Sequence, residues 1–165
     1  MPQVPWVETD DAAIARLAVE HLAERGFRNF AYCGDRQFAW SRGREEVFAA
    51  AVRERGGKCE VWNSATPDRT GASWSTEHRR LGEWVQGLPK PIGILACYDI
   101  QAQRLLDACR DVGTAVPEEA AVLGVDDDQL LCDLCSPPLS SIVPNTRRTG
   151  YAAAETLDRL MRGEA

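Results

Sequence analysis

Three short apolar segments, each followed by polar or turn residues, decide the fold of this chain: IGILACYD (92–99), AAVLGVDDD (120–128) and PPLSSIVP (137–144). Residues with helical spacing separate the first two segments, and a short helical stretch precedes the third. This alternation predicts parallel strands joined by crossover helices. Asp99 and Asp126 directly follow the first two predicted strands, at the edge where ligands bind in open α/β sheets.

The rest of the chain shows the same alternation. Apolar residues at helical spacing predict further helices after Asp10, after Trp40, around Leu81 and from about Thr146 to Met161. Short apolar runs predict strands at 30–33 and 59–62. The predicted fold class is therefore α/β, a Rossmann-like, open, mostly parallel sheet with helices on both faces.

The first ten residues fit this alternation less well. Val4–Val7 has the composition of a strand, yet no earlier segment of the chain can pair with it. We therefore interpret residues 1–10 as a strand and crossover from an N-terminal lobe that the chain lacks. Residues 11–145 would be a C-terminal lobe, and residues 146–165 a helix that returns toward the other lobe.

The composition limits the class of protein. The chain has 165 residues, a formal net charge of −6, 44% hydrophobic residues and 27% charged residues, which are ordinary globular values. No apolar run approaches the ~20 residues of a membrane span, and the start lacks the pattern of a signal peptide. We expect a soluble, cytoplasmic protein without membrane contact. Because the charge is negative, any contact with DNA would require a domain outside this chain.

The six cysteines allow two interpretations. Four of them fall in predicted strands or on apolar helix faces, which favours free thiols in a reducing compartment. Alternatively, Cys132 and Cys135 form a CxxC pair that could bind metal or cycle between redox states. A structural zinc ion needs four ligands, and neither histidine has ligand-like spacing, so we expect no metal and no cofactor.

Several segments together resemble the effector-binding domain shared by LacI/GalR-type regulators and periplasmic sugar-binding proteins. They are DDAAIARLAVEHLAERGFRNFAYCG (10–34), REEVF (44–48), CYD (97–99), VPEEAAVLGVDDD (116–128) and PLSSIV (138–143). The closer likeness is to regulators of xylose operons, which place this domain ahead of an AraC-type DNA-binding domain. WSRGREEVF (40–48), LGEWVQGLP (81–89) and PLSSIVPNTRRTGYAAAETLDRLM (138–161) carry that closer likeness.

The resemblance implies a sugar, D-xylose or a similar pentose, held between two lobes of a dimeric transcription regulator without catalysis. It places a ligand-contacting arginine on Arg44 and a ligand-contacting aspartate on Asp126. Asp99 and Trp40 complete the candidate set, because aspartate accepts hydrogen bonds from hydroxyls and an indole can stack on a sugar face. The family often has Asn where this chain has Tyr98.

Each candidate also has a simpler interpretation. Asp99 could cap the following helix, Arg44 could be a solvated residue of a first helical turn, Trp40 could serve packing alone, and Asp126 could belong to a solvated loop. Two other functions also remain open. A periplasmic solute-binding protein would have the same fold, and the aspartates at 126–128 could hold Mg²⁺ in a phosphoryl-transfer enzyme.

Overall fold

The computed structural model describes residues 5–64 and 74–163 of the chain. These residues belong to two compact units. One unit, Asp11–Val143, contains a sheet and its covering helices; the other contains the described parts of Met1–Asp10 and Pro144–Ala165. The candidate residues all lie in Asp11–Val143, so this unit positions the site.

The sheet of this unit has five strands in the order β2-β1-β3-β4-β5, and every pair of neighbours is parallel. The strands are β1 (Asn29–Asp35), β2 (Cys59–Ser64), β3 (Ile92–Ala96), β4 (Ala120–Val125) and β5 (Ser140–Ile142). The predicted α/β fold class is confirmed. Because β2 lies on one side of β1 and β3 on the other, the strand order reverses between β1 and β3, where such sheets bind ligands.

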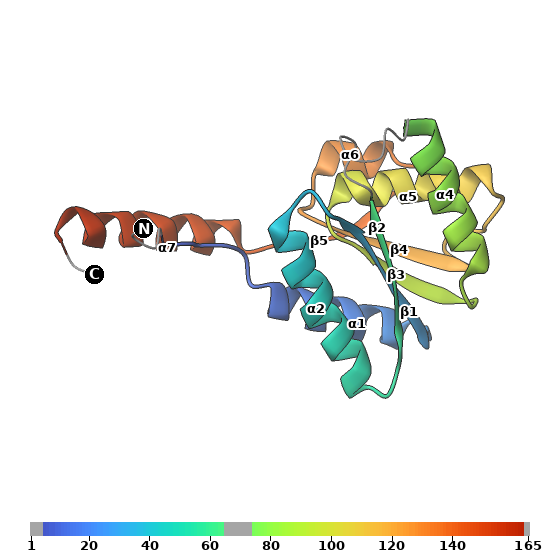
Figure 1. Ribbon diagram of the computed structural model, residues 1–165, viewed down its shortest axis with the longest axis horizontal. Helices are drawn as coiled ribbons and strands as arrows, with labels where there is room; N and C mark the ends of the chain where they lie inside the picture. Colours follow the sequence, from blue (N-terminus) through green and yellow to red (C-terminus); the bar gives the residue numbers. More distant parts are fainter. Residues whose placement is uncertain (1–4, 65–73, 164–165) are drawn as a thin grey trace. The chain divides into compact units, whose positions relative to one another are not determined.

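Helices cover both faces of the sheet (Figure 1). One face carries α1 (Asp11–Glu24) and α2 (Ala39–Glu54); the other carries α4 (Trp74–Gly87), α5 (Asp99–Asp111) and α6 (Gln129–Leu134). Helix α1 buries Ile14, Ala18 and Leu22, which recur every four residues on one stripe. The helix ends at Glu24, and the chain turns at Gly26, whose positive φ of 92° suits a residue without a side chain.

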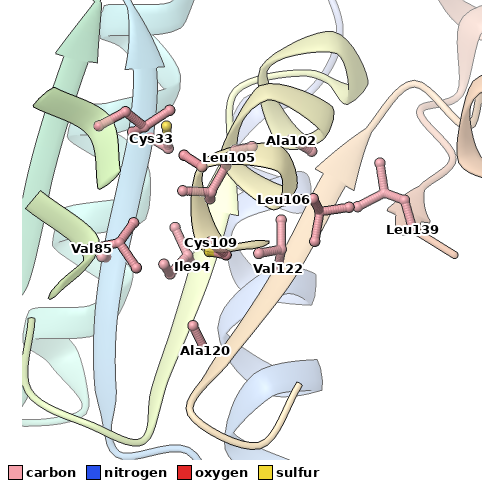
Figure 2. Close-up of a cluster of buried hydrophobic side chains, with 14 of the residues drawn as sticks. Cys33, Val85, Ile94, Ala102, Leu105, Leu106, Cys109, Ala120, Val122 and Leu139 are labelled. Atoms are coloured by element: carbon pink, nitrogen blue, oxygen red, sulfur yellow. The ribbon is translucent and has the colours of Figure 1, made fainter. Parts of the chain in front are cut away.

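Successive strand residues send their side chains into two separate cores. In β3, Ile94 packs under α4 and α5, whereas Leu95 packs under α1 and α2. Figure 2 shows the core beneath α4 and α5. Its labelled members are Cys33, Val85, Ile94, Ala102, Leu105, Leu106, Cys109, Ala120, Val122 and Leu139. Both faces of β3 and β4 are buried throughout, which explains why these strands are continuous apolar runs in the sequence.

The second unit differs from expectation at its first segment. Residues 5–10 form no regular secondary structure, and Val4 lies outside the described residues. A strand is held by hydrogen bonds to a neighbouring strand, and no described strand pairs with Pro5–Val7. The unit's helix α7 (Thr146–Met161) has no buried residue and exposes Tyr151, Leu157, Leu160 and Met161. No helix in the described ranges is long and apolar enough to cross a membrane.

All six cysteines are free, and only Cys59 is more than slightly exposed. Burial raises the pKa of Cys59, Cys97 and Cys132 to about 12 and that of Cys109 to about 11. The thiolate is the reactive form of cysteine, so a raised pKa and a buried sulfur both slow its reactions.

We therefore expect the folded protein to react slowly with a thiol reagent such as iodoacetamide at mildly alkaline pH, with Cys59 modified first. The same protein unfolded in guanidinium chloride should be modified at all six positions, which provides the control. Mass spectrometry of the labelled peptides measures both. Rapid labelling of Cys97 or Cys132 in the folded protein would contradict the packing described here.

Candidate ligand-binding site

Arg44 is a buried cation between two helices and a strand end. Its position in α2 places it on the same stripe as Phe48 and Val52, and it is only 4% exposed. Its Nε donates to Asp11 Oδ1 at 2.8 Å, and its Nη1 donates to the carbonyl oxygen of Cys97. The interpretation of Arg44 as a solvated residue is therefore wrong.

These contacts locate the guanidinium at the switch point of the sheet. Cys97 directly follows β3, and α2, which carries Arg44, follows β1. Asp11 opens α1 on the same face of the sheet. Arg44 therefore lies over the carboxyl ends of β1 and β3, where the strand order reverses and a crevice for ligands is expected.

Three aromatic side chains form a cluster here, and one of them, Trp40, contacts the guanidinium. Trp40, in the first turn of α2 rather than in the preceding loop, stacks on Phe38 with ring centroids 5.1 Å apart and meets Tyr98 edge-on at 5.8 Å. The Arg44 guanidinium carbon lies 5.1 Å from the Trp40 ring centroid, a cation–π contact. The Tyr98 hydroxyl donates to Asp35 Oδ2 at 3.3 Å, and burial raises the pKa of Tyr98 to about 12.

Asp126 provides an exposed carboxylate at the end of β4. Its φ of 116° lies in the region that non-glycine residues rarely adopt, and its amide donates to the Ile142 carbonyl at 3.0 Å. Desolvation by neighbouring atoms raises the pKa of the Asp126 carboxyl, and the charge on Arg44 opposes this rise. The Arg44 cation and the Asp126 carboxylate thus lie within electrostatic range of each other.

Asp99 stands behind Asp126 and is 2% exposed. Its Oδ2 accepts from the Asp128 amide at 2.9 Å, and its Oδ1 accepts from Ser141 Oγ at 2.6 Å. The Cys132 thiol also donates to Oδ2, at 3.7 Å. The side chain does not cap α5, because no side-chain hydrogen bond caps that helix. Its carboxylate instead joins the loop after β4 to β5.

The loop of residues 126–128 depends on this buried carboxylate. The Asp127 amide donates to Ser141 Oγ at 3.1 Å, and Asp127 also has a positive φ, 57°. Asp128 caps α6 by accepting from the Leu131 amide at 3.2 Å. The three aspartates therefore face different partners, and within residues 5–64 and 74–163 no three His, Cys, Asp or Glu side chains are grouped as metal ligands would be.

Gly124 leaves the space that Asp99 occupies. A Cβ built on Gly124 would lie 2.1 Å from Asp99 Oδ1, much closer than atoms in contact can approach. The glycine of the VLGVD segment is thus required by a neighbouring side chain rather than by its own backbone.

Sequence reasoning missed several residues of this site. It assigned no role to Asp11, Phe38 or Ser141, and it noted Tyr98 only as a departure from the family pattern. Asp11 lies 33 positions before its partner Arg44, and Ser141 lies 42 positions after Asp99. Contacts between residues so far apart along the chain leave no local pattern in the sequence. Only the position of Ser141, in the strand next to β4, could have indicated a role in the site.

Comparison with known families agrees with this fold. Residues 19–165 match the family described as periplasmic binding protein-like domain. The chain belongs to this family. The predicted resemblance to the LacI/GalR-type and periplasmic binding-protein domains is confirmed. The matching family is that of periplasmic binding protein-like domains, and the similar solved structures include a LacI family regulator.

Among curated proteins, the chain is similar to the xylose operon regulatory proteins of Haemophilus influenzae and Escherichia coli K12. It is 32% identical to each, over 99% and 97% of its own length but only 42% and 41% of theirs. The chain thus spans about two-fifths of the length of these relatives.

Among solved structures, the chain resembles the xylose-binding transcription activator XylR, with a TM-score of 0.84 and 32% identity over 100% of this chain and 44% of that one. It also resembles the transcriptional regulator CelR in complex with cellobiose, with a TM-score of 0.75 and 25% identity over 99% of this chain and 49% of that one.

A double-mutant cycle tests the contact between Gly124 and Asp99. We expect Gly124→Ala to lower the free energy of unfolding by roughly 2 kcal/mol or more, because displacing the carboxylate leaves buried donors unpaired. In an Asp99→Ala background the same substitution should cost much less, since the clashing atom is gone. Urea unfolding followed by circular dichroism measures each value.

Gly43→Ala is the matched control. Gly43 is an exposed residue of α2, and a Cβ there would have only an ordinary contact, 3.9 Å from Asp11 Oδ2. Alanine has the higher helix propensity, so this variant should be as stable as the parent or about 0.5–1 kcal/mol more stable. Additive effects of Gly124→Ala and Asp99→Ala would refute the contact.

Proposed function

We propose that this chain is the effector-binding part of a bacterial transcription regulator that responds to a sugar, D-xylose or a similar pentose. The observation that carries the proposal is the joint position of Arg44, the aromatic group of Phe38, Trp40 and Tyr98, and Asp126 at the carboxyl end of one parallel sheet. The similarity to xylose operon regulators supports the choice of sugar.

A neutral sugar presents hydroxyls around a ring and apolar C–H groups on its faces. The Asp126 carboxylate can accept hydrogen bonds from two neighbouring hydroxyls, and the Arg44 guanidinium supplies donors nearby. Trp40 and Phe38 offer an apolar aromatic surface of the kind that C–H groups pack against. Opposite charges beside an aromatic surface therefore suit a neutral, polyhydroxylated ligand.

In this proposal Asp99 does not contact the ligand itself. Its two oxygens already accept protein donors, so we assign it a positioning role. Through Asp128 and Ser141 it fixes the loop that orients the Asp126 carboxylate. Carboxylates held by such neighbours lose less conformational entropy on binding, which raises affinity.

This unit would form one wall of the binding cleft, and a second lobe would supply the other. A sugar that contacts both walls favours the closed state through its differential affinity for it, and closure would then reposition DNA-binding domains. On this proposal the protein is cytoplasmic, acts as a homodimer, contacts DNA only through another domain and catalyses no reaction.

Calorimetric titration of the complete gene product with D-xylose, L-arabinose and D-glucose tests the function. We expect saturable binding, tightest for D-xylose, and at least a tenfold loss of affinity in Asp126→Asn, because a hydrogen bond to a charged group contributes about 1.5–3 kcal/mol. Asp133→Asn, which changes an exposed carboxylate in α6, is the matched control and should bind normally. Absence of heat with all three sugars would refute the proposal.

The raised pKa of Asp126 adds a pH dependence to this binding. As the pH falls toward that pKa, which lies above the ordinary value of 3.8, the carboxylate takes up a proton and loses acceptor capacity. Affinity for the sugar should therefore fall toward acid pH in the parent protein and change little over the same range in Asp126→Asn. Calorimetry across that range measures the difference.

Loss of the negative charge on Asp126 should affect stability and sugar binding in opposite directions. A raised pKa means that the folded state disfavours the ionised carboxyl, so the cost to stability is complete above that pKa and disappears below the ordinary value of 3.8. Asn and Asp are alike in their tolerance of positive φ, so the substitution should add no new backbone strain. At neutral pH and without sugar, Asp126→Asn should therefore be at least as stable as the parent, which separates a binding defect from a folding defect.

A further inference from the structure

Three buried polar atoms on the α4 and α5 face of the sheet have no hydrogen-bond partner among the residues that the structure describes. They are Trp62 Nε1, Ser64 Oγ and His78 Nδ1. Ser64 is 5% exposed. Leaving such groups unpaired costs about 1–3 kcal/mol each, so native proteins rarely do so without a reason.

The three residues line one cavity of about 210 Å³. Trp62 and Ser64 are alternate residues near the carboxyl end of β2, so their side chains point to the same face of the sheet. His78 lies in the second turn of α4, which covers that face, and Leu81 adds an apolar wall. The cavity therefore combines polar atoms in need of partners with apolar surface, the usual character of a small-molecule site.

This cavity is distinct from the proposed effector site. Arg44 packs with α1 and α2 on one face of the sheet, whereas Trp62 and His78 belong to the face covered by α4 and α5. No residue that lines the cavity is among Arg44, Asp126, Asp99 and Trp40. Helices α2 and α4, which carry Arg44 and His78, cover opposite faces of the sheet (Figure 1).

The hydrogen-bonding character of the cavity specifies its ligand. His78 Nε2 lies 2.8 Å from Asp111 Oδ2, an acceptor, so a neutral imidazole carries its hydrogen on Nε2 and presents Nδ1 as an acceptor. The Trp62 indole offers only a donor, and the Ser64 hydroxyl can act as either. A ligand that both donates and accepts, as hydroxyl groups do, would pair with all three atoms.

The charges on the cavity wall and the volume of the cavity narrow the class of ligand further. The cavity wall carries both Arg104 and Glu77, so it favours neither an anion nor a cation. Its volume is smaller than the ~300–1,000 Å³ of pockets for drug-sized ligands. We propose that this cavity is a second binding site, for a neutral, polyhydroxylated molecule no larger than a monosaccharide, with Trp62, Ser64 and His78 as its hydrogen-bonding residues.

The Trp62 indole provides a direct reporter of occupancy. In the ¹⁵N-labelled 165-residue chain, its Nε1–H resonance can be identified among the five tryptophans by its loss in Trp62→Phe. We expect titration with D-xylose, myo-inositol or glycerol to shift this resonance to saturation for at least one of the three. Ser64→Ala should weaken that binding at least tenfold, as expected for a buried hydrogen bond whose partner is left unpaired.

Three further variants make the result decisive. His78→Phe keeps a ring but lacks Nδ1, and should also weaken binding. Ser140→Ala, which removes an exposed hydroxyl in β5 outside this cavity, and Asp126→Asn, in the proposed effector site, should leave it unchanged. Thermal unfolding of each variant checks that it is folded.

Two outcomes would overturn the proposal. A Trp62 resonance that none of the three probes shifts to saturation would mean that the cavity holds water only. A shift that Asp126→Asn abolishes and Ser64→Ala leaves unchanged would place the binding in the effector site instead. Because the two sites have separate variants, failure here would leave the proposed effector function standing.

Discussion

The buried guanidinium of Arg44 holds together the part of the molecule on which the site depends. It pairs with Asp11 at the start of α1 and with the Cys97 carbonyl at the end of β3, while its own helix follows β1. A buried charge is costly unless it is paired, and removing one partner of such a pair costs about 3–5 kcal/mol. The same contact that secures two helices to the sheet therefore fixes a cation at its ligand-binding edge.

A second buried charge organises the opposite side of that edge. The Asp99 carboxylate accepts donors from the loop after β4, from β5 and from α6. Two consecutive aspartates of the loop adopt positive φ angles, which cost energy and persist only where surrounding contacts hold them. The buried carboxylate supplies such contacts, and Gly124 supplies the room for it. Exposed Asp126 is thus oriented by a residue that is itself shielded from solvent.

The two faces of the sheet present their polar groups differently. On the face of α1 and α2, buried Arg44 has defined protein partners, and the ligand is proposed to meet groups that are already positioned. On the face of α4 and α5, Trp62, Ser64 and His78 surround a cavity with polar atoms that no described residue satisfies. Pre-formed partners favour a selective site, whereas unsatisfied atoms indicate that something else completes the hydrogen bonding.

The sequence by itself determined the parallel α/β fold, because strand and helix periodicities are local and the right-handed crossover leaves few topologies. It also determined that Asp99 and Asp126 would follow two strands that are successive along the chain. Tertiary structure alone decided that Asp99 is buried behind the loop while Asp126 is exposed, and that Arg44 pairs with Asp11. It also decided that Phe38 and Tyr98 join Trp40. The reason is physical: burial and pairing depend on which segments meet in space, and residues 33 or 42 positions apart meet only once the sheet has formed.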